Sequence, residues 1–245
     1  MAKINLSGFD KTTGFNFADI LAESLHDILD YESEKFTATG IKLSDDAQNY
    51  MTFSGSGLKY KMIDGEVSGI TAGTIKSFTV VSDGIMLVSE TGLSLSGKTL
   101  AAAFDSGSTT KFFDALLSGG DTITGTNYAD TFGGGKGNDK LYGGKGNDTL
   151  SGDAGKDTLT GGAGSDTFVF ETMSGVDTIK DFDAIGADHD WIDLSGLASV
   201  NDFSDLQASH MRTVGKNVVI DGGNGDKLII ENVKLSQLDA GDFIF

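Results

Sequence analysis

The sequence predicts a mainly β protein: a right-handed parallel β-roll with a β-rich C-terminal cap, preceded by an α+β N-terminal segment. Aspartates recur every nine residues through the middle of the chain, and an apolar residue stands two places after each of them. Of the 35 glycines, 15 lie within residues 119–168, and the chain contains no proline. Abundant glycine without proline favours a fold that uses many tight or left-handed backbone positions.

The nonapeptide period has a direct structural interpretation. The aspartates are Asp121, Asp130, Asp139, Asp148, Asp157 and Asp166, and the apolar residues that follow are Ile123, Phe132, Leu141, Leu150, Leu159 and Phe168. A three-residue strand turns only its middle side chain inward, and the six residues before it form a turn. A closed coil needs two such units, so one full turn of the coil takes 18 residues. We therefore expect aspartates to stack in the pairs 121/139, 130/148, 139/157 and 148/166.

The turns between these strands have the composition of a calcium site. Stacked strands lie about 4.7–4.9 Å apart, and Ca²⁺ takes about six to eight oxygen ligands at about 2.3–2.6 Å. An ion therefore fits between two stacked turns, bound by one carboxylate and by backbone carbonyls from each. Glycines let the backbone aim those carbonyls inward. The predicted ligands are the six aspartates and the turn residues Gly135, Gly137, Gly144, Gly146, Gly155, Gly162 and Gly164. A flexible Gly/Asp linker is the alternative, but a linker does not place apolar residues at a constant spacing.

The same geometry predicts that the repeats need their metal. Two bare carboxylates about 4.8 Å apart repel by roughly 1 kcal/mol in water and by several-fold more at a protein surface. Glycine-rich turns also lose the most backbone entropy on ordering. One apolar residue in nine does not offset both costs, so we expect this region to be disordered without calcium and to fold on binding several ions.

Three segments are expected: residues 1–118, the roll at 119–168 and the cap at 169–245. In the first, helical spacing of apolar residues after Asn16 predicts a helix over 16–30, whose acidic polar face favours packing on its own domain rather than on a membrane. Alternating patterns predict strands at 58–62, 75–80 and 85–88, with turns at 64–65 and 83–84. Short helices are expected at 100–104 and 111–117.

The cap reads as short strands and turns. A hairpin is expected between 218–220 and 228–230, joined by a long loop at 221–226. The apolar residues at 243–245 would normally fray, because chain ends are poorly ordered unless they are tied down.

Composition excludes several classes of function. The net charge of −18 repels phosphate backbones, so nucleic acid is not an expected partner, whereas cations are. The chain has no cysteine, which excludes disulfides and thiolate metal sites. It has no apolar run of 18 residues, so no integral membrane segment is expected. The first 14 residues lack the apolar core of a classical signal peptide.

No catalytic constellation is evident in the sequence. His26, His189 and His210 are not in paired-ligand spacing, and no nucleophile elbow is present. An enzyme is therefore not the favoured interpretation, although a glycan-active enzyme using scattered carboxylates, carried by residues 1–118, stays open. A glycan-binding module is another alternative, because Tyr50, Phe53 and Tyr60 lie in the strand-rich part of that segment. A place in the core of that segment is the favoured interpretation of these aromatic residues.

Residues 134–168 resemble the RTX (repeats-in-toxin) calcium-binding β-roll. The stretches 167–170, 175–182, 191–195 and 240–245 are similar to the C-terminal cap of serralysin-type proteases and mannuronan epimerase R-modules. The resemblance implies that Asp177 and Asp181 are further calcium ligands. One departure is the segment 187–190, where the family usually has a shorter turn.

The resemblance also implies a route of export. Proteins of this family carry an uncleaved C-terminal signal for type I secretion by an ABC transporter, in which an acidic residue precedes a terminal apolar triplet, as at 242–245. An extracellular protein is therefore expected, one that crosses the transporter unfolded and folds where calcium is abundant.

Residues 1–118 lack the zinc signature of serralysins. They are more similar to the N-terminal segment of small secreted proteins of rhizobia, some of them nodulation-signalling proteins, through the stretches 92–96 and 112–117. This similarity implies a role in cell-surface, matrix or host interaction.

Overall fold

The computed structural model describes residues 2–5, 33–37, 40–44, 50–63, 66–82, 85–96, 99 and 116–245. The chain forms two compact units that divide between Gly119 and Gly120. The predicted helices at 16–30 and 100–104, and most of the one at 111–117, lie outside the described residues. So do the predicted turns at 64–65 and 83–84.

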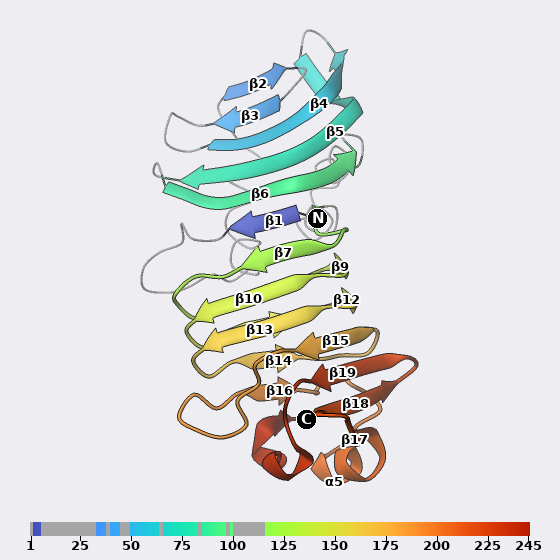
Figure 1. Ribbon diagram of the computed structural model, residues 1–245. Helices are drawn as coiled ribbons and strands as arrows, with labels where there is room; N and C mark the ends of the chain where they lie inside the picture. The colour runs from blue at the N-terminus through green and yellow to red at the C-terminus, as the bar shows by residue number, and fades with distance from the viewer. Residues whose placement is uncertain are drawn as a thin grey trace. The chain divides into compact units, whose positions relative to one another are not determined.

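The N-terminal unit contains an antiparallel sheet (Figure 1). Its strands are β1 (Ala2–Asn5), β2 (Ser33–Thr37), β3 (Gly40–Ser44), β4 (Tyr50–Ile63), β5 (Glu66–Ser82) and β6 (Ile85–Ser96), in the order β1-β6-β5-β4-β3-β2. The strands expected at 58–62, 75–80 and 85–88 are confirmed as parts of β4, β5 and β6. Phe53, Leu58 and Ile75 are buried, and Lys76 is exposed, as the alternation of a strand requires.

The second unit is a coil of parallel strands in two facing sheets. One sheet stacks β7 (Asp121–Thr124), β10 (Lys140–Lys145), β13 (Thr158–Ala163), β15 (Val176–Ile179) and β19 (Asp226–Ile230). The other stacks β8 (Thr131–Gly133), β11 (Thr149–Ser151), β14 (Thr167–Val169), β16 (Trp191–Asp193) and β20 (Phe243–Ile244). Two short strands, β9 (Lys136–Gly137) and β12 (Ala154–Gly155), pair in the turns. The mainly β fold with a parallel β-roll is therefore confirmed.

The register of the roll is the one that its period requires. Leu141 pairs with both Ile123 and Leu159, each 18 residues away, and Leu150 pairs in the same way with Phe132 and Phe168. All six of these apolar side chains are at most 3% exposed. The core of the roll is thus a single file of apolar side chains from each sheet, and the turns with their aspartates lie at its margins.

The cap closes the roll with irregular elements as well as strands. The helical turns at Phe203–Asp205 (α5) and Leu206–His210 (η2) were not expected from the sequence, and 3₁₀ turns follow at Leu235–Gln237 (η3) and Ala240–Asp242 (η4). The strands β17 (Met211–Val214) and β18 (Asn217–Gly223) extend the first sheet in antiparallel fashion beyond β19.

One expectation about the cap is wrong. The hairpin between β18 and β19 has no long loop, because Gly223 pairs with Asp226 and only Asn224 and Gly225 turn the chain. Both residues have positive φ, 54° and 103°, which is the requirement of a two-residue type I′ turn. The C-terminal strand β20 is tied to the roll, because it pairs with β16 and Phe243 is only 6% exposed.

Candidate calcium sites along the roll

The aspartates of the roll stack in two rows. The first row is Asp121, Asp139, Asp157 and Asp177, and the second is Asp130, Asp148, Asp166 and Asp190; all eight residues are at most 3% exposed. In each row, the backbone N–H of one aspartate donates to Oδ1 of the next. The distances along the first row are 2.7, 2.7 and 3.0 Å, and along the second 2.8, 2.9 and 2.9 Å. The four pairs expected from the period are therefore stacked as expected.

The second carboxylate oxygen is what makes these rows candidate metal sites. Oδ2 of Asp139, Asp148, Asp157 and Asp177 is buried and accepts no hydrogen bond within the described residues. Burying a carboxylate oxygen that accepts no hydrogen bond carries a large desolvation cost. A hard cation that takes oxygen ligands, such as Ca²⁺, would satisfy it.

Metal ligation here would need backbone oxygens as well as side chains. Among the residues that the structure describes, no three His, Asp or Glu side chains converge as a metal cluster. Each site would therefore combine a carboxylate from each of two stacked turns with carbonyl groups of those turns. Asp139 and Asp157, or Asp148 and Asp166, would supply the side chains.

Left-handed glycines shape the backbone of the turns. Gly135, Gly137, Gly144, Gly146, Gly162 and Gly164 all have positive φ, between 82° and 139°. Glycine adopts these angles without steric cost, and they set the direction of the peptide groups in the turn. A Cβ at Gly155 would overlap the carbonyl oxygen of Gly137, so this position needs glycine because two turns approach closely.

The first glycine of each turn is a requirement that sequence reasoning missed. A Cβ at Gly134 would lie 2.6 Å from Oδ2 of Asp139, and one at Gly152 would lie 2.7 Å from Oδ2 of Asp157. These glycines keep open the space beside the unpartnered oxygen. Their fixed phase, five residues before each aspartate, was the available signal.

Burial sets the electrostatics of the rows. Burial, together with the charges of neighbouring aspartates, raises the pKa of Asp139 and of Asp148 to about 7, and that of Asp166 to about 6. Burial also raises the pKa of Asp157 and Asp177. Ionised carboxylates are thus unfavourable in the metal-free roll at neutral pH, and a bound divalent cation would compensate them.

The cap contributes aspartates to both rows, one expected and one not. Asp177 continues the first row, whereas both oxygens of Asp181 accept N–H groups, from Gly161 and Gly162, each at 3.0 Å. Asp190, which was not predicted, continues the second row: its Oδ1 accepts from Asp166 N and its Oδ2 from Asp183 N, at 2.9 and 2.8 Å. Asp190 belongs to the segment 187–190 that departs from the family pattern.

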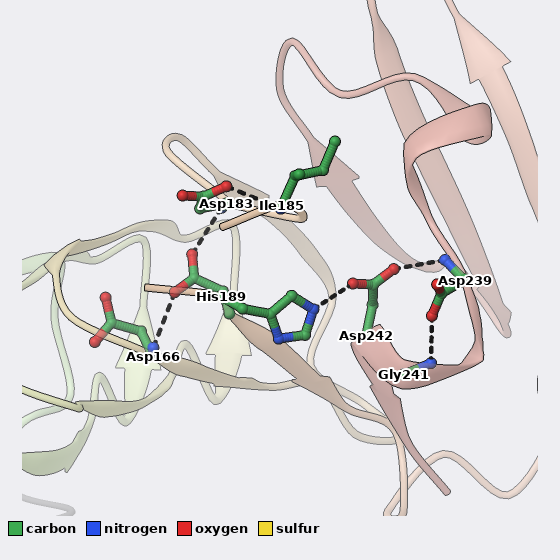
Figure 2. A network of polar contacts seen from close by, with 8 residues as sticks. Asp166, Asp183, Ile185, His189, Asp239, Gly241 and Asp242 are labelled. Atoms are coloured by element: carbon green, nitrogen blue, oxygen red, sulfur yellow. Dashed lines mark hydrogen bonds and ion pairs between the residues drawn. The ribbon is translucent and has the colours of Figure 1, made fainter. Parts of the chain in front are cut away.

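The two histidines in the described part of the chain make separate contacts. His189 Nε2 lies 2.6 Å from Oδ1 of buried Asp242, on the C-terminal segment (Figure 2). His210 Nδ1 lies 2.7 Å from the backbone oxygen of Asp221 instead. His26 is outside the described residues.

The family follows from the repeats. A family model of the RTX calcium-binding nonapeptide repeat matches residues 117–150 and 133–168, in four copies. The chain belongs to the RTX proteins. The matched residues of this RTX protein are those that form the stacked turns of the roll, so these turns are calcium-binding repeats. No curated protein sequence matches the chain.

Several solved structures are similar to this RTX protein. The AlgE6R3 subunit of a mannuronan C5-epimerase from Azotobacter vinelandii is 30% identical over 53% of this chain and 80% of its own, with a TM-score of 0.42. The AlgE6R2 subunit of that enzyme is 27% identical over 52% and 89%, with a TM-score of 0.39. The extracellular lipase LipA from Serratia marcescens is 14% identical over 86% and 30%, with a TM-score of 0.41.

In the described part of the chain, no helix has the length and apolar character needed to cross a membrane.

Proposed function

We propose that this RTX protein is exported unfolded by a type I secretion system, folds outside the cell by binding several calcium ions, and then acts in cell-surface, matrix or host interaction. The observation that carries this proposal is the set of buried, unpartnered Oδ2 atoms on Asp139, Asp148, Asp157 and Asp177. Without a cation these oxygens destabilise the roll, and with calcium they hold its turns together. Folding is therefore linked to a calcium concentration found outside cells.

The C-terminal segment fits a signal that is read only in the unfolded chain. In the folded roll, Asp242 is 2% exposed and Phe243 is 6% exposed. The N–H of Leu194 donates to the carbonyl of Ile244 at 2.8 Å, which ties this segment to the roll. A transporter that recognises an acidic residue and its apolar neighbours would find them accessible only before the roll forms.

The export part of the proposal is tested by deleting residues 242–245 in cells that express an ABC exporter. We expect the shortened chain to stay inside the cells. The matched control is the double variant Asp139→Asn and Asp157→Asn, which keeps the C-terminal segment but weakens calcium binding, and which we expect to be exported. Normal export of the shortened chain would contradict the signal assignment.

A role at a surface rests on the N-terminal unit and on the outer face of the roll. Within the N-terminal unit, Phe53 is 1% exposed, so it is a core residue and not part of a sugar-stacking surface. The side chains of Tyr50 and Tyr60 are outside the described part of the chain. We place the specific interaction of the protein in residues 1–118, where the similarity to secreted rhizobial proteins lies.

Binding of an acidic polysaccharide by the roll is a second candidate function. The ring of Tyr142 is 39% exposed on the outer face of β10, and Thr124 and Thr160 flank it in register on β7 and β13. Lys140 is exposed on the same face. An exposed aromatic ring, neighbouring hydroxyls and a cation suit a sugar that carries a carboxylate, and two of the similar structures come from a mannuronan C5-epimerase.

The polysaccharide candidate is tested by measuring binding of the calcium-loaded protein to a polyuronate. We expect Tyr142→Ser to weaken binding at least tenfold, whereas Val214→Ser, at an apolar residue on β17 that is 50% exposed, leaves it unchanged. Equal binding by wild type and Tyr142→Ser would remove this candidate.

A further inference from the structure

The antiparallel sheet of the N-terminal unit has a register that sorts its residues by chemistry. Its six strands, from β2 to β1, pair without a bulge over three consecutive rows of positions. The middle row is apolar except at one position, and its residues are Phe36, Ile41, Phe53, Phe78, Glu90 and Ile4. The two flanking rows are Thr37, Gly40, Ser54, Ser77, Thr91 and Lys3, and Lys35, Lys42, Thr52, Thr79, Ser89 and Asn5.

The two flanking rows share the open face of this sheet. Successive positions along a strand belong to opposite faces. Phe53 in the middle row is 1% exposed, whereas Thr37 and Ser54 in a flanking row are exposed. The middle row therefore belongs to the covered face and the flanking rows to the face that solvent reaches. We call the twelve positions of the flanking rows the open face.

The open face differs in charge from the chain as a whole. The sequence has 36 Asp and Glu residues against 18 Lys and Arg. In the described strands, the twelve positions of the open face nevertheless hold three lysines, at Lys3, Lys35 and Lys42, and no acidic residue. Seven of the other nine positions are Ser or Thr. At physiological salt the Debye length is about 8 Å, so a ligand here meets the local lysines more than the distant acids.

This composition suits a ligand that carries both hydroxyl groups and repeated negative charges. Ser and Thr hydroxyls donate and accept hydrogen bonds, as sugar hydroxyls do. One exposed ion pair contributes little, so a small anion gains little from a single lysine, whereas a polymer with a charge on each unit can meet several lysines at once. Neighbouring strands lie about 4.8 Å apart, which makes a row across six strands about 24 Å long. The face thus has the length for an extended chain of sugars.

We infer that the open face of the N-terminal sheet binds an acidic polysaccharide, one built from sugars that carry carboxylates. The lysines attract the carboxylates, and the Ser and Thr hydroxyls form hydrogen bonds with the sugar hydroxyls. Because the two rows contain no aromatic residue, binding here depends on charge and hydrogen bonds and not on ring stacking. This inference rests on the proposed surface role of residues 1–118 and adds the chemical class of the partner.

Binding of a short oligogalacturonate to the calcium-loaded full chain, measured by isothermal titration calorimetry, tests the inference. The double variant Lys35→Thr and Lys42→Thr removes both lysines of one row and keeps a residue that favours strands. We expect its affinity to fall about tenfold. The matched control is Lys216→Thr with Lys234→Thr, which removes two exposed lysines of the cap and changes the net charge equally. This control should bind as wild type does, and equal weakening in both double variants would overturn the inference.

Measurements on the wild-type protein do not depend on how the variants fold. Its affinity for oligogalacturonate should fall as salt is raised and should exceed its affinity for a neutral oligosaccharide of the same length. Equal binding of the neutral oligosaccharide, or of a short DNA duplex, would overturn the inference. Full binding by the Lys35→Thr and Lys42→Thr variant, together with loss of binding in Tyr142→Ser, would place the sugar on the roll and overturn it as well.

Failure of the inference and failure of the proposed function give different results. Wild-type protein that does not fold on adding calcium, or that is not exported, would refute the proposed function. Wild-type protein that is exported and folds with calcium but does not bind oligogalacturonate would refute only the inference about the open face.

Discussion

The backbone N–H of Asp139 donates a 2.7 Å hydrogen bond to Oδ1 of Asp157, 18 residues further along the chain. This contact holds one turn of the roll on the next and leaves Oδ2 of both carboxylates buried without a partner. A single aspartate thus links two neighbouring turns by a hydrogen bond and presents its other oxygen to a metal ion. The behaviour of the roll with calcium and with pH follows from this division of roles.

Acid should partly substitute for calcium. Burial raises the pKa of Asp139 and Asp148 from the ordinary value of 3.8 to about 7 in the folded, metal-free roll. A raised folded pKa means that the folded state binds more protons than the unfolded state between those two values. The stability contribution of these groups is fully present below about pH 4 and is lost as pH rises through 7. Circular dichroism of the chelated protein should show more β structure at pH 4.5 than at pH 8.

Calcium affinity should depend on pH in the opposite direction. Protons compete with calcium for the same carboxylates, so affinity should rise as pH increases from 5 to 8 and calcium binding should release protons. Calorimetric titrations in buffers of different ionisation enthalpy measure both quantities. Affinity that is the same at pH 5 and pH 8 would show that the carboxylates with raised pKa are not the ligands.

The first glycine of a turn should be essential for calcium binding. In Gly134→Ala, the new Cβ would lie within 3 Å of both Oδ2 of Asp139 and the carbonyl of Gly152, so we expect calcium affinity to fall at least tenfold. Gly215→Ala is the control: its φ is 65° and no atom lies within 4 Å of the new Cβ. Backbone strain should cost that variant about 1 kcal/mol of stability without changing its calcium affinity. Equal affinities in the two variants would contradict the steric argument.

The single file of apolar residues should carry most of the packing energy of the roll. Leu141 is fully buried between Ile123 and Leu159, so Leu141→Ala should lower the free energy of unfolding by about 2–5 kcal/mol in saturating calcium. Thr160→Ala, on the outer face of the next strand, should change it by less than about 0.5 kcal/mol. Urea unfolding followed by circular dichroism provides both values, and a Leu141→Ala variant as stable as Thr160→Ala would refute a core built from one residue per repeat.

The contact between His189 and Asp242 should hold the C-terminal strand on the roll. His189→Ala removes the side chain that meets Asp242 at 2.6 Å and packs edge-on against Trp191. Hydrogen exchange of residues 239–244 should then become faster, while the repeats stay protected. His210→Ala is the matched control, since its ring contacts Asp221 instead, and it should leave exchange at 239–244 unchanged. Unaltered exchange in His189→Ala would show that β20 is held by strand pairing alone.

Sequence periodicity predicted the repeats well because their structure is itself periodic. An aspartate such as Asp139 and an apolar residue such as Leu141 recur every nine residues, so the residues that they pair with, 18 residues away, could be named in advance. Asp177 and Asp190 follow their row partners by 20 and 24 residues, where the chain makes longer excursions. No period identifies such positions, and Asp190 was missed for this reason. The short turn at Asn224-Gly225 was misread because the neighbouring glycines and aspartates resemble a loop, although they pair across the hairpin.

The measurement that tests the central claim most directly is hydrogen exchange of the full chain with and without calcium, followed peptide by peptide over residues 119–245. With calcium, amides of the stacked turns such as those of Asp139 and Asp148 should be strongly protected. After chelation at pH 7.5, the same amides should exchange at the rate of an unstructured chain, and adding calcium back should restore protection. Protection of the roll that survives chelation unchanged would contradict the claim that calcium folds this protein.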